Sequence, residues 1–245
     1  MRNIKLTIQY DGTAYHGWQS QKNAVTVQEV LEKAIFKLTG ARPRVTGCSR
    51  TDTGVHAKHF VCNFGSETTI PCDKIPLALN SFLPDDIVCL SAEDESADFH
   101  SRYSAKKKRY TYYIQNSKFP DVFKVNYSWH YSFPLNVEEM QKAAEAFLGE
   151  HDFIGFAASG FTVKTTVRTI YDISVTREGD VVKISVLGNG FLYNMVRIIA
   201  GTLIKVGNGD YSPKQMLEII DACDRSKAGP TAPAHGLTMI GLEYE

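Results

Sequence analysis

Residues 167–187 read VRTIYDISVTREGDVVKISVL. Two runs rich in β-branched residues, 167–175 and 181–187, flank the polar residues REGD at 177–180. A polar turn with glycine between two such runs is typical of a β-hairpin. Because a hairpin joins antiparallel strands, this stretch predicts an antiparallel sheet in the second half of the chain.

Helix signals lie before and after this hairpin. Thr26 and Asn136 each stand where a helix would begin, with a glutamate three residues on, and Gly40 and Gly149 stand where those helices would end. Further helices are predicted over residues 73–82, 191–206 and from Ser212, and further strands over 4–10, 59–64, 87–90, 99–114 and 237–244. Paired strands covered by helices predict an α+β fold with a largely antiparallel sheet.

The length of 245 residues allows one large domain or two halves of about 120 residues that share an interface. The boundary is predicted between about residues 119 and 134. We therefore expect an N-terminal half over residues 1–118, which carries a polar loop around Asp52, and a C-terminal half over 119–245, which carries the helix with Arg197 and the closing strand.

The charge of the whole chain does not indicate a nucleic-acid binder, because 27 Lys and Arg residues balance 27 Asp and Glu residues. The distribution is less even. Residues 106–109 are KKKR, Arg102 lies just upstream, and tyrosine and phenylalanine rings are interspersed among these bases. This segment predicts either a positively charged RNA-binding edge or simply a solvated hairpin.

The sequence also constrains location and covalent chemistry. No run approaches the roughly 18 apolar residues of a membrane span, and the first residues form a strand pattern instead of a signal peptide, so we expect a cytoplasmic protein. The five cysteines are scattered and include no Cys-x-x-Cys pair, which favours reduced thiols over disulfides or a zinc site. His56 and His59 lack a third candidate ligand nearby, so we expect no metal.

Residues 47–57, GCSRTDTGVHA, form a loop between two predicted strands. A carboxylate before Thr-Gly is often just an Asx turn that satisfies its own backbone. Asp-Thr-Gly also occurs in aspartic proteases, but those enzymes need two such carboxylates and this chain has one Asp-Thr-Gly. A third interpretation, that Asp52 is a catalytic nucleophile, depends on the rest of the chain.

Several further motifs share one order along the chain. They are YDG at 10–12, GWQ at 17–19, RTDTGVHA at 50–57, FHSRYSA at 99–105, RYTY at 109–112, FLGEHDF at 147–153, MVRIIAG at 195–201, GL at 236–237 and LEY at 242–244. Together they resemble the tRNA pseudouridine synthase A (TruA) family over essentially the whole chain.

The resemblance implies a fold, a reaction and partners. The fold would be two similar α/β halves with a continuous, largely antiparallel sheet flanked by helices and an active-site cleft between the halves. The reaction would convert uridine to pseudouridine at positions 38–40 of the tRNA anticodon stem-loop, on a flipped base and without cofactor or metal. The enzyme would act as a homodimer.

The resemblance also assigns roles to individual residues. Asp52 would be the nucleophile, Arg197 its ion-pair partner, and Tyr110 the ring that stacks on the flipped uracil and handles its proton. Substrate contacts would come from Arg50, Arg102, Lys106, Lys107, Lys108, Arg109, Tyr110 and Leu237.

Elementary chemistry is consistent with these roles. An aspartate with a reference pKa of ~3.9 is ionised at neutral pH and needs no partner base. A guanidinium within the apolar run MVRII at 195–199 calls for a partner, and pairing with Asp52 is the favoured interpretation over an arginine on the polar surface of the helix. The alternative function is an RNA-binding module that has this fold, assists tRNA folding and lacks catalysis.

Overall fold

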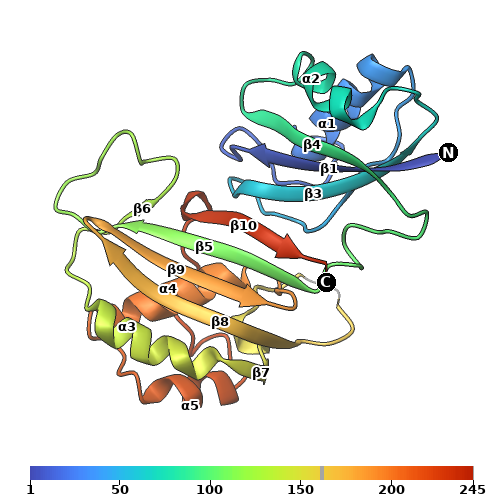
Figure 1. Ribbon diagram of the computed structural model, residues 1–245. Coiled ribbons are helices and arrows are strands. Elements are labelled where there is room, and N and C mark those ends of the chain that lie inside the picture. The colour runs from blue at the N-terminus through green and yellow to red at the C-terminus, as the bar shows by residue number, and fades with distance from the viewer. Residues whose placement is uncertain (161–162, 245) are drawn as a thin grey trace. The chain divides into compact units, whose positions relative to one another are not determined.

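The computed structural model describes residues 1–160 and 163–244 (Figure 1). The chain divides into two compact units. Unit 1 comprises Met1–Lys106 and Met239–Glu245, and unit 2 comprises Lys107–Thr238.

Unit 1 contains an antiparallel sheet whose central strand is β1 (Arg2–Tyr10). Its neighbours are β3 (His56–Ser66) and β4 (Ile87–Glu95), and the short strand β2 (Thr46–Gly47) pairs with β3. Alternation along β1 buries Ile4, Leu6 and Ile8 on one face, as its sequence predicts.

Two helices cover this face, α1 (Val27–Thr39) and α2 (Ile75–Asn80), the second preceded by a 3₁₀ turn at Cys72–Lys74 (Figure 1). The Thr26 side chain accepts a hydrogen bond from the Glu29 N–H at 3.4 Å, and Gly40 ends α1 in the left-handed region with φ of 75°. Both ends of α1 are therefore where the capping residues predict them.

Unit 2 contains the strand order β5 (Lys107–Gln115), β9 (Val181–Gly188), β8 (Val167–Glu178) and β7 (Gly149–Asp152), with every neighbouring pair antiparallel. The short β6 (Trp129–His130) runs parallel to β5. The predicted hairpin is present as β8–β9, and Gly179 takes the turn with φ of 57°.

Helices α3 (Val137–Ala144) and α4 (Met195–Gly207) contact each other and the sheet, and α5 (Gln215–Asp221) packs by β7 (Figure 1). Short 3₁₀ turns lie at Glu145–Phe147, Ile154–Phe156 and Ala234–Gly236, and β10 (Leu237–Glu243) follows the last of them. The predicted α+β class with a largely antiparallel sheet flanked by helices is confirmed. None of the helices in the described part of the chain has the length and apolar character to cross a bilayer.

Four boundaries differ from those the sequence predicts. The unit boundary lies at Lys106/Lys107 and not at residue 118/119, because β5 pairs with β9 from Lys108 to Gln115. Residues 239–245 belong to unit 1, where the Lys106 N–H donates to the Glu243 carbonyl at 2.8 Å. Helix α4 begins at Met195 instead of 191, after Asn194 in the left-handed region with φ of 61°, and α5 begins at Gln215 instead of 212.

The predicted strand over 99–114 begins only at Lys107. Residues 100–104 instead form a turn, in which the Ser104 N–H donates to the His100 carbonyl at 2.9 Å. The His100 Nδ1 accepts hydrogen bonds from the N–H groups of Arg102 and Tyr103 at 3.2 and 3.3 Å. Local side-chain hydrogen bonds thus replace strand pairing in this segment.

Candidate active site

The loop that carries Asp52 lies between β2 and β3 in unit 1. The Val55 N–H donates to the Asp52 carbonyl at 3.1 Å, and Gly54 between them is in the left-handed region with φ of 77°. Thr51 is buried and Asp52 is half-buried. The carboxylate therefore projects from a tight, internally bonded turn.

A second loop, residues 11–18, holds this turn on both sides of Asp52. Before it, the Trp18 N–H donates to the Thr51 carbonyl at 3.2 Å, and the hydroxyl groups of Tyr10 and Thr51 share a buried hydrogen bond of 2.8 Å. After it, the Gly54 N–H donates to the Tyr15 carbonyl at 3.2 Å. The backbone around Asp52 is thereby fixed to the end of β1.

Two glycines allow this close approach. A Cβ on Gly17, whose φ is +80°, would lie 2.4 Å from the Thr51 carbonyl oxygen and 3.1 Å from the Asp52 carbonyl carbon. A Cβ on Gly12 would lie 2.1 Å from the Val55 carbonyl oxygen. The Gly12 N–H also donates to Nδ1 of the buried His56 at 3.0 Å. Both positions thus require glycine because backbone approaches backbone there.

Arg197 lies in the first turn of α4, in unit 2. Its Nε donates to the Ala232 carbonyl at 2.7 Å, and its Nη1 donates to Asn194 Oδ1 at 2.7 Å. The Arg197 side chain is half-buried, so it is neither fully exposed on the helix surface nor fully enclosed. These two acceptors fix the direction of the guanidinium group.

Tyr110 lies on β5, with 6% of its surface exposed and its ring 5.4 Å from the ring of Phe191 in an edge-to-face arrangement. Two residues on, Tyr112 faces the same side and donates its hydroxyl to the Pro233 carbonyl at 2.7 Å. Burial raises the pKa of Tyr112 above its usual range, and the charge of Arg197 opposes that increase only in part. Tyr112 therefore stays a hydrogen-bond donor.

The carbonyl groups of Ala232 and Pro233 connect these two parts of unit 2, because one accepts from Arg197 and the other from Tyr112. The segment that contains them lies directly against α4. A Cβ on Gly201 would come within 1.8 Å of the Pro230 carbonyl oxygen. Leu237, which the resemblance assigns to substrate contact, is buried just beyond this segment.

Asp52 belongs to unit 1, whereas Tyr110 and Arg197 belong to unit 2. Their predicted association therefore stays a prediction.

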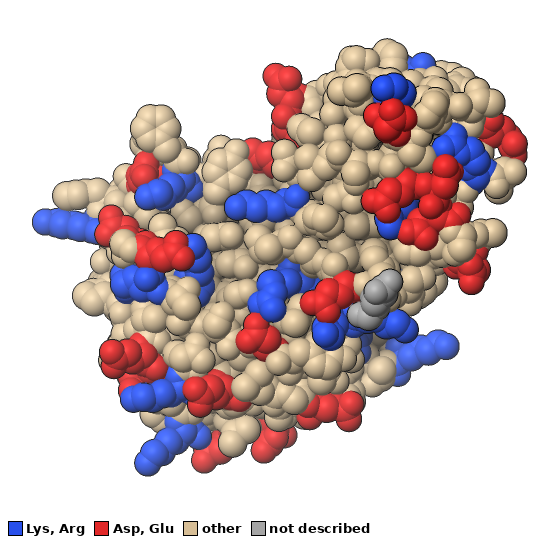
Figure 2. Space-filling view, viewed as in Figure 1, with Lys and Arg blue, Asp and Glu red and all other residues tan. Residues whose placement is uncertain are grey.

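The basic segment 106–109 does not present four equivalent cations. Lys106 is exposed, Lys108 is half-buried, and the Lys107 ammonium lies 5.6 Å from the centre of the Tyr171 ring. Arg109 pairs with Asp172 at 2.8 Å and also donates to Ser185 Oγ at 3.2 Å. On the face shown in Figure 2, basic and acidic side chains are interspersed in the same way.

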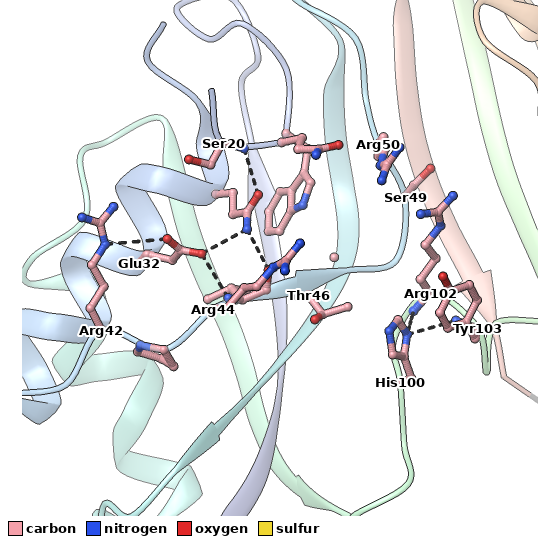
Figure 3. Close-up of a pocket in the computed structure, with 16 residues that line it drawn as sticks. Ser20, Glu32, Arg42, Arg44, Thr46, Ser49, Arg50, His100, Arg102 and Tyr103 are labelled. Carbon is pink, nitrogen blue, oxygen red and sulfur yellow. Dashed lines mark hydrogen bonds and ion pairs between the residues drawn. The ribbon is translucent and has the colours of Figure 1, made fainter. Parts of the chain in front are cut away.

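Two of the predicted substrate-binding residues come together in unit 1. Arg50, in the Asp52 loop, and Arg102, in the turn at residues 100–104, both line a cavity of about 700 Å³ (Figure 3). Their side chains are exposed. They lie 52 positions apart in the sequence, so only the fold reveals that they share a site.

Comparison with known proteins extends these observations. A sequence model of the family described as tRNA pseudouridine synthase matches residues 6–104 and 143–245. The chain belongs to the tRNA pseudouridine synthase family. The resemblance predicted from the sequence motifs is confirmed, together with the expectation that the protein is an isomerase.

Relatives of this family align over their full length. The chain is 54% identical to a tRNA pseudouridine synthase A of Thermoanaerobacter sp. (strain X514) over 244 residues, and 55% identical to one of Ruminiclostridium cellulolyticum over 245 residues, with 100% of each chain covered. A tRNA pseudouridine synthase A of Clostridium acetobutylicum is 48% identical with the same coverage. Among solved structures, one titled "Crystal Structure of a Cbf5-Nop10-Gar1 Complex" aligns with 82% of this chain and 45% of that chain, at 14% identity and a TM-score of 0.37.

Proposed function

We propose that this enzyme isomerises uridine to pseudouridine at positions 38–40 of the tRNA anticodon stem-loop, in the cytoplasm, with Asp52 as the nucleophile. The observation that carries the proposal is the 48–55% identity, over whole chains, to relatives named tRNA pseudouridine synthase A. The fixed backbone on both sides of Asp52 supports its role, because a nucleophile acts best when its approach is preset.

The reaction needs little more than a positioned carboxylate. The bond from N1 of uracil to C1′ of ribose breaks, the base turns, and C5 forms a new bond to C1′. The proton leaves C5 and N1 gains one, so the product is an isomer of the substrate and no oxidant, reductant or energy source is consumed. A carboxylate can form the covalent intermediate either at C6 of the base or at C1′ of the sugar.

Arg197 and Tyr110 complete the proposed machinery. A cation beside the Asp52 carboxylate would keep it ionised in a pocket that excludes water. Arg197 is suited to this because its guanidinium is already oriented by Ala232 and Asn194. We expect the flipped uracil to stack on the Tyr110 ring, which Phe191 holds edge-on.

The proposed enzyme is a homodimer. The segment 116–134 between β5 and α3 exposes many apolar side chains, including Phe119, Val122, Phe123, Val125, Tyr127 and Phe133. Apolar side chains gathered in this way are typical of a surface that another protein covers. Light scattering that gives the mass of a monomer at micromolar concentration would contradict this part of the proposal.

Release of tritium tests the reaction itself. Transfer RNA carrying tritium at C5 of uracil should lose its label to water when incubated with the wild type, since the C5 proton leaves. Asp52→Ala should release none and still bind tRNA, whereas Asp85→Ala, which removes an exposed aspartate elsewhere in unit 1, should behave as wild type. If the wild type binds tRNA and releases no label, the alternative of a non-catalytic RNA-binding module holds.

A further inference from the structure

The cavity in unit 1 that contains Arg50 and Arg102 has a second pair of arginines. In Figure 3, Arg42 and Arg44 lie across the cavity from Arg50 and Arg102, on the segment that joins α1 to β2. Four guanidinium groups thus line one hollow of about 700 Å³. Neither Arg42 nor Arg44 belongs to the motifs that the sequence analysis selects.

Most of the positive charge in this cavity is not neutralised by neighbouring carboxylates. Glu32 is the single carboxylate among the residues that line it. It lies 3.7 Å from Arg42 and also accepts hydrogen bonds from the Val45 N–H and Gln28 Nε2 at 3.1 and 3.0 Å. In residues 1–160 and 163–244, the guanidinium groups of Arg44 and Arg50 have no carboxylate partner, so an excess of cations faces the hollow.

The turn at residues 100–104 adds a flat ring at the rim. Tyr103 is 76% exposed, and its ring lies 4.3 Å from the His100 ring and 5.7 Å from the Arg102 guanidinium. Ser101 anchors this turn, because its buried hydroxyl donates to the Thr46 carbonyl at 2.6 Å and contacts Asn63 Oδ1 at 2.8 Å. The ring is therefore held outward by a rigid support.

The ligand that fits is a chain of phosphates linked to sugars and bases. Guanidinium groups bind phosphate oxygens through paired hydrogen bonds, and an exposed ring stacks on a base or ribose. Ser49 and Arg50 line the cavity and lie only three and two residues before Asp52, so the hollow adjoins the catalytic loop. When one nucleotide of an RNA strand reaches Asp52, the phosphates of the neighbouring nucleotides would lie in the cavity.

We propose that this cavity binds the sugar–phosphate backbone of the tRNA strand next to the target uridine, with Arg42 and Arg44 each contacting a phosphate. The inference rests on the proposed function, since it places a further part of the same substrate. It adds Arg42, Arg44 and Tyr103 to the residues that hold the tRNA.

The salt dependence of tRNA binding tests the proposal. Each phosphate contact contributes roughly 0.7 to 0.9 to the slope of log K against log salt concentration. Measured in the Asp52→Ala background, in which no chemistry interferes, Arg42→Ala/Arg44→Ala should lower the slope by about 1.4 to 1.8. Binding at low salt should weaken about tenfold or more.

A matched control removes equal charge from the same unit. Lys33→Ala/Lys37→Ala deletes two exposed cations of α1 that do not line the cavity, and it should leave the slope as it is. Urea unfolding of all variants verifies that each is folded. An unchanged slope in the arginine variant, or an equal fall in both variants, would overturn the proposal.

Inorganic phosphate separates a backbone site from a small-anion site. We expect millimolar phosphate to leave tRNA binding unchanged at constant ionic strength. If phosphate instead displaces tRNA from the wild type but not from the Arg42→Ala/Arg44→Ala variant, the cavity is a small-anion site and the proposal is overturned. Tritium release by the wild type is scored independently. If the salt slopes differ between the variants as expected and the wild type releases no tritium, the proposed reaction is refuted and the backbone site stands.

Discussion

Replacing Gly17 by alanine should displace Asp52 without removing it. The new Cβ would lie 2.4 Å from the Thr51 carbonyl oxygen, which is roughly 1 Å closer than ordinary van der Waals contact. That oxygen accepts the Trp18 N–H, so the neighbouring backbone cannot yield freely. The Asp52 turn must therefore move by a comparable distance.

The expected magnitude follows from two separate costs. An L-residue in the left-handed region costs about 1–2 kcal/mol, and φ at Gly17 is +80°. A displacement of about 1 Å at a reacting group can lower a rate roughly 100-fold. We expect Gly17→Ala to reduce the single-turnover rate of tritium release about 100-fold and to reduce the free energy of unfolding by at least 1–2 kcal/mol.

Gly40 provides the matched control. Its φ is +75°, but a Cβ there would meet nothing within 4 Å. Gly40→Ala should therefore lose about 1–2 kcal/mol of stability in urea unfolding and keep the wild-type rate. The reasoning is refuted if Gly17→Ala, shown to be folded, retains a rate within a factor of two of wild type.

Three further perturbations test the same structure. Tyr10→Phe removes the buried hydrogen bond to Thr51, and we expect a loss of about 1 kcal/mol in urea unfolding and a lower kcat with KM unchanged; a rise in KM alone would contradict a positioning role. Tyr112→Phe leaves the Pro233 carbonyl without its donor, which should cost about 1–3 kcal/mol, and an unchanged urea midpoint would show that water replaces the hydroxyl. Burial raises the pKa of the Cys89 thiol from its ordinary value of 9.0 to about 12, so the folded state holds a proton that the unfolded state loses; stability present below pH 9 should fall as pH rises from 9 towards 12. Cys89→Ala should flatten that fall by up to about 1.4 kcal/mol per pH unit, and parallel pH profiles for both proteins would disprove the assignment.

Local chemistry explains why much of the fold could be predicted. Thr26 and Asn136 cap helices through their own side chains, and Gly179 takes a conformation that few other residues adopt, so each signal lies within a few residues of its effect. The sequence does not reveal the turn at residues 100–104, because an alternating aromatic and basic pattern also suits a strand. The hydrogen bonds of the His100 ring, which no periodicity reveals, decide the outcome.

The site was predictable only where a motif is continuous in the sequence. Asp52 and Arg50 stand in one run of residues and were selected together. The sequence places Tyr10 at the end of a predicted strand and in the YDG motif, but the partner of its hydroxyl lies 41 positions away. The pair Arg42 and Arg44 looks like an ordinary exposed loop until the fold sets it opposite Arg102.

The composition of unit 1 has a consequence for biosynthesis. Residues 1–106 leave the ribosome long before residues 239–244 are made, yet the Tyr244 ring packs against Phe99 at 5.0 Å and its hydroxyl donates to the Ser101 carbonyl at 3.0 Å. Because domains generally fold as units during synthesis, this one gains the Tyr244 contacts that complete it only after nearly all of unit 2 has emerged. A nascent chain arrested before residue 239 should therefore be cut by protease around Ser101 more readily than the released protein.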